Sequence, residues 1–191
     1  MTDLVPTTAL GDAAPCTATF GSLTLTENDR LALASVALRR NMDVPAPMGL
    51  ALPGPGPGDW VEGVGVAAFW TGPGQWMIEG PVPEDPREDF AAEVLRNAPG
   101  CSVTEQTDGW VAVEIVSDAG EGPILDLLER LVNLDPVTLR PGKASRTVLE
   151  HLGVFVIRRD EDRLAVIGMR SAAGSLWHAL STAAHRLEGA A

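Results

Sequence analysis

The pattern of apolar and polar positions along the chain predicts an α+β protein. Short apolar runs bounded by turn residues predict strands, and longer stretches with an apolar residue every three or four positions predict helices. The predicted strands lie at 61–70, 75–80, 101–107, 110–116, 144–151, 154–159 and 163–169. The predicted helices lie at 27–41, 85–98, 122–133 and 171–187.

The sequence around Asp108–Gly109 predicts a β-hairpin over 101–116. This dipeptide separates CSVTEQT from WVAVEIV and favours a two-residue turn. The second strand is expected to alternate between two faces, with Val111, Val113 and Ile115 on one and Trp110, Ala112 and Glu114 on the other.

Capping residues support the predicted helices. Thr26 and an acidic first turn precede the helix at 27–41, and Asp85–Pro86 begins the helix that ends near residue 98. The acids around Asp85 favour the positive end of that helix dipole, which we prefer to a metal or acid–base site. Ser171 is expected to cap the last helix, whose apolar stripe consists of Leu176, Leu180, Ala183, Ala184 and Leu187.

From residue 75 onward, the order of strands and helices predicts a ferredoxin-like core. Its split βαβ arrangement has a mainly antiparallel sheet with helices on one face. Residues 1–22 show no sustained period and are expected to form a flexible arm. Residues 23–191 are expected to form a single α+β domain, with a Pro/Gly-rich linker at 45–58.

Charge argues against a nucleic-acid ligand. The chain has 191 residues with 14 Lys plus Arg and 26 Asp plus Glu, a net charge of -12, whereas phosphate binding needs a basic surface. The charge is uneven, because residues 1–135 hold 21 acids and 6 bases while residues 136–191 hold 5 acids and 8 bases. This asymmetry is typical of solvated faces or of a charge match with a partner.

The cysteines and the N-terminal sequence favour a cytoplasmic protein. Cys16 and Cys101 lack metal-ligand spacing and are expected to be reduced thiols. The N-terminus lacks the basic and apolar regions of a signal peptide, and no run is long enough to span a membrane.

The residues that carry chemistry form no recognisable catalytic or metal site. His178 and His185 are seven residues apart in the last predicted helix, about 10.5 Å along its axis, which is too far to share one metal easily. No nucleophile elbow, Walker loop or dinucleotide fingerprint is present.

Trp177 is a candidate contact residue. It lies off the apolar stripe of the last helix, close to Arg170 and Ser171. This side chain could belong to the core or to an interface with a partner, and the sequence leaves both alternatives open. The interface is considered because Trp and Arg are frequent interface anchors.

Three short motifs follow one another along the chain: GPGQW at 72–76, Leu134–Asp135–Pro136 followed by Pro141–Gly142, and Arg170–Ser171 followed by Leu176–Trp177. In their order and spacing these motifs resemble the gamma subunit of heterotetrameric sarcosine oxidase. The likeness runs from about residue 23 to 187. The resemblance implies a fold similar to the amino-terminal folate-binding domain of glycine-cleavage aminomethyltransferase.

The resemblance also implies a role without catalysis. The family's assembly demethylates sarcosine oxidatively to glycine, with hydrogen peroxide and either formaldehyde or 5,10-methylenetetrahydrofolate as further products. This chain would carry no cofactor and no catalytic residue, and it would dock directly on the alpha subunit in an assembly with beta and delta. FAD, FMN, NAD, zinc and tetrahydrofolate would bind to the other subunits.

Three functions stay open at this point. The leading hypothesis is the structural subunit just described, with Arg170, Ser171 and Trp177 as candidate contacts. The second is a folate-binding one-carbon transferase that works alone, although the aminomethyltransferases are much longer than this chain. The third is the equivalent subunit of a related N-methyl amino acid dehydrogenase, such as one that acts on N-methylglutamate.

Overall fold

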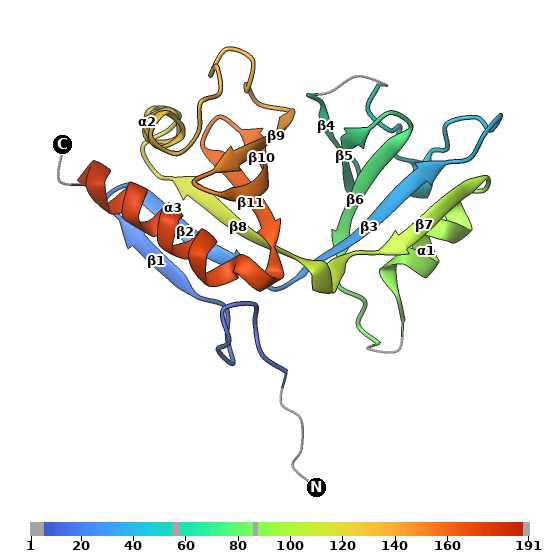
Figure 1. The fold of residues 1–191 in the computed structure, drawn as a ribbon, viewed down its shortest axis with the longest axis horizontal. Helices are drawn as coiled ribbons and strands as arrows, with labels where there is room; N and C mark the ends of the chain where they lie inside the picture. The colour runs from blue at the N-terminus through green and yellow to red at the C-terminus, as the bar shows by residue number, and fades with distance from the viewer. Residues whose placement is uncertain (1–5, 55–57, 86–87, 189–191) are drawn as a thin grey trace, which may run out of the picture.

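The computed structural model describes residues 6–54, 58–85 and 88–188. Its strands form two antiparallel sheets (Figure 1). Sheet A has the strand order β1-β2-β8-β11-β10-β9, and sheet B has the order β4-β5-β6-β3-β7. The strands of sheet A are β1 (Thr17–Phe20), β2 (Leu23–Asn28), β8 (Trp110–Ser117), β9 (Lys143–Leu149), β10 (Leu152–Asp160) and β11 (Arg163–Met169). Those of sheet B are β3 (Leu31–Leu38), β4 (Trp60–Glu62), β5 (Ala67–Gly72), β6 (Gln75–Pro81) and β7 (Cys101–Glu105).

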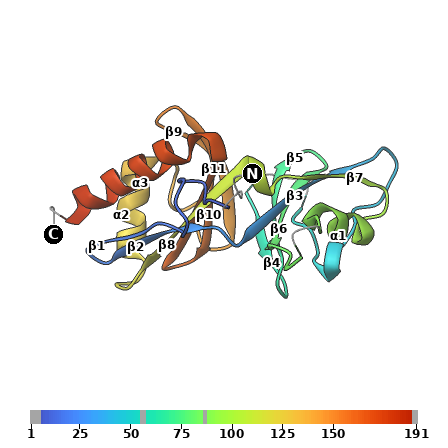
Figure 2. The same ribbon diagram turned by 90° about the horizontal axis from the view of Figure 1, so that it is seen from below.

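Helices cover the outer face of each sheet. The helices α2 (Gly122–Leu131) and α3 (Ala173–Glu188) lie beside sheet A, and α1 (Phe90–Asn97) lies beside sheet B at the opposite end of the molecule (Figures 1 and 2). Three short 3-10 turns complete the described elements: η1 (Pro47–Gly49), η2 (Thr107–Gly109) and η3 (Arg170–Ala172).

Three apolar clusters hold these layers together, because each sheet buries both of its faces. One cluster lies between sheet A and its helices, and includes Leu25, Ile115 and Leu180. A second lies between sheet B and α1, and includes Val36 and Phe90. The third joins the inner faces of the two sheets, with residues of sheet B (Leu33, Trp60, Ala67, Phe69, Met77) against residues of sheet A (Ala112, Ala144, Phe155, Ile157, Ala165, Ile167).

The predicted fold class is confirmed as α+β with antiparallel sheets. The split βαβ unit is present in sheet B, since β6 and β7 are both antiparallel to β3, which lies between them, and α1 connects them. The strands expected to form one sheet are divided between two, so the helices lie on one face of each sheet separately.

The helix predicted at 27–41 is wrong. This segment contains the end of β2, a turn, and the whole of β3. Both faces of β3 are buried, with Ala34 and Val36 against the α1 side and Leu33 against sheet A. A strand covered on both faces loses its alternation of apolar and polar residues, so its Leu- and Ala-rich sequence was mistaken for a helix.

The hairpin predicted over 101–116 is also wrong, although the two strands and the turn are real. β7 pairs with β3 in sheet B, whereas β8 pairs with β2 and β11 in sheet A. The 3-10 turn at Thr107–Gly109 therefore carries the chain from one sheet to the other. The predicted alternation of β8 is correct, because Val111, Val113 and Ile115 face the helices while Ala112 faces sheet B.

The segment expected to be a flexible arm includes a strand and makes contacts with the sheets. Residues 17–20 form β1, and the buried Glu27 carboxylate accepts hydrogen bonds from the backbone N–H groups of Leu10 and Cys16 at 3.0 and 3.1 Å. Residues 1–5 lie outside the described residues.

The predicted linker at 45–58 packs on the outer face of sheet B over much of its length. Leu50 is buried in the α1-side cluster, and the Pro53 carbonyl accepts a hydrogen bond from Trp76 Nε1 at 3.0 Å. Residues 55–57 lie outside the described residues, as does Pro86, the expected first residue of the helix that the structure begins at Phe90.

The remaining predictions differ in detail from the structure. The run at 61–70 contains two strands, β4 and β5, because Gly65 turns the chain with a φ of 73°. The other predicted strands are confirmed, as are the last two helices and the free state of both cysteines. No helix in the described part of the chain is long and apolar enough to cross a membrane.

Candidate functional site

The predicted contact residues lie around the beginning of α3. Arg170 and Ser171 belong to η3, and Trp177 lies in the second turn of the helix. The Arg170 Nη2 donates to the backbone carbonyl of Thr7 at 3.1 Å, Ser171 is exposed, and Trp177 is half-buried against the sheet A core. The structure thus brings the three residues to one end of α3 but gives Arg170 and Trp177 contacts within the chain.

An apolar patch adjoins this end of α3. It consists of Val148, Gly153 and Met169, and the side chains of Val148 and Met169 are 61% and 57% exposed. Val148 is paired with Gly153 across β9 and β10, and Gly153 and Met169 line a hollow of about 130 Å³ that reaches Leu176 of α3. Exposed apolar residues that gather in this way are typical of protein contact surfaces.

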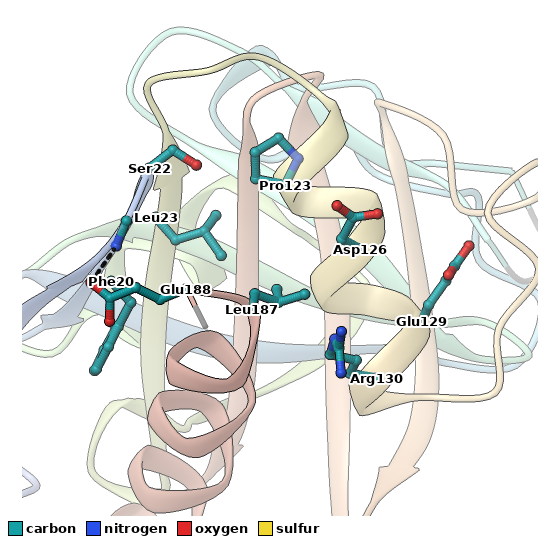
Figure 3. Close-up of a pocket in the computed structure, with 10 residues that line it drawn as sticks. Phe20, Ser22, Leu23, Pro123, Asp126, Glu129, Arg130, Leu187 and Glu188 are labelled. Carbon is teal, nitrogen blue, oxygen red and sulfur yellow. Dashed lines mark hydrogen bonds between the residues drawn. The ribbon is translucent and has the colours of Figure 1, made fainter. Parts of the chain in front are cut away.

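A groove of about 520 Å³ lies at the other end of α3. Figure 3 shows Pro123, Asp126 and Arg130 of α2 on one side, and Phe20, Leu187 and Glu188 on the other. Glu188 Oε1 accepts a hydrogen bond from the backbone N–H of Gly21 at 3.3 Å, which joins the end of α3 to the β1–β2 turn. With carboxylates at Asp126, Glu129 and Glu188 against one guanidinium, the lining of the groove carries an excess of negative charge.

A group of charged side chains lies between the two sheets. Arg159 of β10 donates to Glu79 of β6 at 2.7 Å and to both carboxylate oxygens of Glu114 of β8 at 3.0 Å. Glu79 also accepts a hydrogen bond from Trp60 Nε1 at 2.8 Å, and Glu114 accepts one from Asn28 Nδ2 at 3.2 Å. The guanidinium carbon of Arg159 lies 5.3 Å from the centroid of the Trp60 ring.

These contacts give the inter-sheet charged group a structural role. Burial acts to lower the pKa of Arg159, but Glu79 and Glu114 outweigh it and raise that pKa, so the guanidinium stays charged. Burial raises the pKa of Glu79, and the ion pair with Arg159 and the bond from Trp60 act against this rise. Every carboxylate oxygen of the two acids accepts a hydrogen bond, which suits a clamp between the sheets rather than an acid–base catalyst.

Sequence reasoning missed this group because its members lie far apart along the chain. The one available signal was Glu114, a charged residue on the same predicted face of its strand as Trp110 and Ala112. In the part of the chain that the structure describes, no group of three or more His, Cys, Asp and Glu residues is placed to hold a metal ion. His178 and His185 are both exposed on α3.

The fold is similar to that of a chain in heterotetrameric sarcosine oxidase from Corynebacterium sp. U-96, a structure solved in complex with pyrrole 2-carboxylate. The TM-score is 0.72 at 17% sequence identity, and the match covers 90% of this chain and 88% of that one. The likeness at this identity is one of fold.

The fold is also similar to part of the glycine cleavage system aminomethyltransferase T from Bartonella henselae. The TM-score is 0.52 at 15% identity, and the match covers 82% of this chain but 44% of the aminomethyltransferase. This chain therefore spans less than half the length of that protein. No protein-family model and no curated protein sequence matches the chain.

Proposed function

We propose that this protein is a non-catalytic structural subunit of a heterotetrameric sarcosine oxidase. The observation that carries the proposal is the extent of the structural match in both directions. Nearly all of this chain corresponds to nearly all of one chain of the sarcosine oxidase, whereas it corresponds to less than half of the aminomethyltransferase. A chain that matches one subunit over 90% of its own length and 88% of that subunit is suited to the place of that subunit.

The proposed assembly is a cytoplasmic oxidoreductase that demethylates sarcosine to glycine. Its FAD, FMN, NAD, zinc and tetrahydrofolate bind to other subunits, and this chain docks on the alpha subunit beside beta and delta. The inter-sheet charged group supports a structural role for this chain, because its acids and its base are bonded to one another.

The proposed docking surface is the apolar patch together with the beginning of α3. Val148 and Met169 supply exposed apolar area, and Ser171 and Trp177 extend it along the helix. Contact surfaces commonly combine an apolar centre with a large aromatic residue and a polar rim. Arg170, already bonded to Thr7, fixes the N-terminal segment at the edge of this surface.

Native purification of a tagged form of this chain from its own cells tests the proposal. We expect a yellow assembly with a flavin spectrum, three further polypeptides and sarcosine-dependent production of hydrogen peroxide. Recovery of a colourless monomer with no copurifying subunits would contradict the structural-subunit role.

The same preparation separates the two other hypotheses. In one outcome the chain purifies alone and calorimetry detects the binding of tetrahydrofolate to it. That result would favour a folate-binding one-carbon transferase that works alone, in line with the fold match to aminomethyltransferase. If the chain purifies in a flavin-containing assembly that oxidises N-methylglutamate and leaves sarcosine unchanged, the structural role holds and the substrate of the complex is different.

A further inference from the structure

A cleft of about 320 Å³ opens between the two sheets, and its residues Arg146 and Phe155 lie on the same face of sheet A as Val148 and Gly153 of the apolar patch. Its walls belong to the β9–β10 side of sheet A and the β4–β5 side of sheet B, two parts of the molecule that Figure 1 labels. The loop between α2 and β9 closes one wall. The described residues that line it come from both sheets and from this loop, and include Thr71, Thr138, Leu139, Arg146 and Phe155.

The floor of the cleft is apolar and fixed in place. Leu139, Ala144 and Phe155 are buried, and Phe155 belongs to the cluster that joins the sheets. Its ring packs against Phe69 of sheet B with 4.9 Å between the centroids. The Trp110 ring packs against the Phe155 ring too, with 5.6 Å between the centroids, so Phe155 is 5% exposed and supplies a firm apolar floor.

The polar groups around this floor are hydroxyls and cations. Among the described residues that line the cleft there is no carboxylate, although the whole chain has 26 acids and a net charge of -12. Lys143 forms an ion pair with Asp59 at the rim, so most of its charge is compensated. The guanidinium carbon of Arg146 lies 5.9 Å from the centroid of the Phe155 ring, and within the described residues no carboxylate is recorded as its partner.

We propose that this cleft binds a small organic anion that has a compact apolar body and a carboxylate. The body lies over the apolar floor, while the guanidinium of Arg146, which is exposed at the cleft, pairs with the carboxylate, a geometry for which guanidinium groups are well suited. Thr71 and Thr138, which carry hydroxyl groups, also line the cleft. The volume is at the lower end of the range for small-molecule sites, which favours a ligand of about one ring.

The test uses the full chain, without partners, and three probes: benzoate, neutral benzamide and inorganic phosphate. Amide chemical-shift titration by NMR measures affinity and position together. We expect benzoate to shift the resonances of Ser145, Arg146 and Phe155, and to bind at least tenfold more tightly than benzamide or phosphate. Equal affinity for benzamide would overturn the anion selectivity, and equal affinity for phosphate would overturn the need for an apolar body.

Two variants separate the role of Arg146 from a general effect of charge. Arg146→Ala is expected to weaken benzoate binding at least tenfold, and Arg146→Lys to retain part of the affinity. The matched control is Arg96→Ala, which removes an exposed arginine from α1 on the far side of sheet B and should leave binding unchanged. The proposal is wrong if benzoate does not bind, if it shifts other residues, or if the Arg146→Ala and Arg96→Ala proteins bind it equally.

Discussion

Glu105 shows how one side chain holds three elements together. It lies at the end of β7, and one carboxylate oxygen accepts the backbone N–H of Ala91 in the first turn of α1 at 2.9 Å. The other oxygen accepts the hydroxyl and the backbone N–H of Thr107, with the N–H at 3.2 Å, and the N–H of Gln106 at 3.3 Å. Burial would raise the pKa of Glu105, but these hydrogen bonds outweigh it and lower that pKa below its ordinary value.

Replacing Glu105 by Gln is expected to lower the free energy of unfolding by about 1–2 kcal/mol at pH 7. The folded pKa is depressed, so the carboxylate stabilises the fold above its ordinary pKa, and this stabilisation is lost as the pH falls through the folded pKa. The difference between wild type and Glu105→Gln should therefore shrink in acid. Urea unfolding at pH 7 and pH 3 measures it, with the exposed Glu129→Gln as the control. A difference that is equal at both pH values would contradict the role of the charge.

Residue-scale contacts of this kind could not be predicted from the sequence. Glu105 and Ala91 are 14 positions apart, and Arg159 and Glu79 are 80 apart. Nothing in either local pattern distinguishes these charges from solvated ones. Such pairs follow from the packing of the sheets, which has to be known first.

At the scale of elements, the success of prediction depended on whether the residue types and their pattern distinguish a strand from a helix. α3 and β8 were predicted well, because α3 has one buried stripe and the two faces of β8 differ in composition. β3 was predicted as a helix, because apolar residues occupy both of its faces. The predicted pairing of β7 with β8 was wrong for another reason. The Asp-Gly turn predicts a reversal of the chain but does not determine which strands pair.

The packing of α1 on sheet B depends on the absence of a side chain at Gly80. A Cβ atom there would lie 2.4 Å from Cε2 of Phe90, the first residue of α1. Gly80→Ala should therefore push α1 away from β6 and cost about 1–3 kcal/mol in the free energy of unfolding. Thermal or urea unfolding measures the change.

Three further variants, Gly153→Ala, Phe90→Leu and the double variant Gly80→Ala/Phe90→Leu, test whether this steric contact is the cause. Gly153→Ala is the matched control, since a Cβ atom in that strand meets nothing within 4 Å. Adding Phe90→Leu to Gly80→Ala should recover part of the lost stability, because the smaller side chain makes room. If the double variant is simply the sum of the two single losses, the clash with Phe90 is not the cause.

At the scale of the whole molecule, the proposed docking surface can be tested without disturbing the core. Met169 is 57% exposed, so Met169→Glu should change the stability of the isolated chain by less than about 0.5 kcal/mol. It places a charge in the apolar patch and is expected to reduce recovery of the flavin-containing assembly at least tenfold. Leu95→Glu, at a 49% exposed position on α1, is the control and should leave assembly intact. Full assembly by Met169→Glu would mean that another surface makes the contact.

Trp177→Ala gives a more complex result at the same surface. The side chain is half-buried against the sheet A core, so its removal should lower both the melting temperature and the recovery of the assembly. A lowered melting temperature with normal recovery would assign Trp177 to the core alone, the alternative that its sequence position left open.

The chain path between the sheets has a consequence for folding. Residues 31–105 form sheet B and are inserted between β2 and β8, which are neighbours in sheet A, with Asn28 paired with Ala112. The β2–β8 pair must therefore close a long loop, which is costly in chain entropy. The pairing of Ala34 with Glu105 in sheet B holds the two ends of that loop close together in the folded protein. If sheet B forms early, it shortens the loop that the β2–β8 pair has to close. The effective contact order of sheet A is then much lower than the sequence separation of β2 and β8 implies.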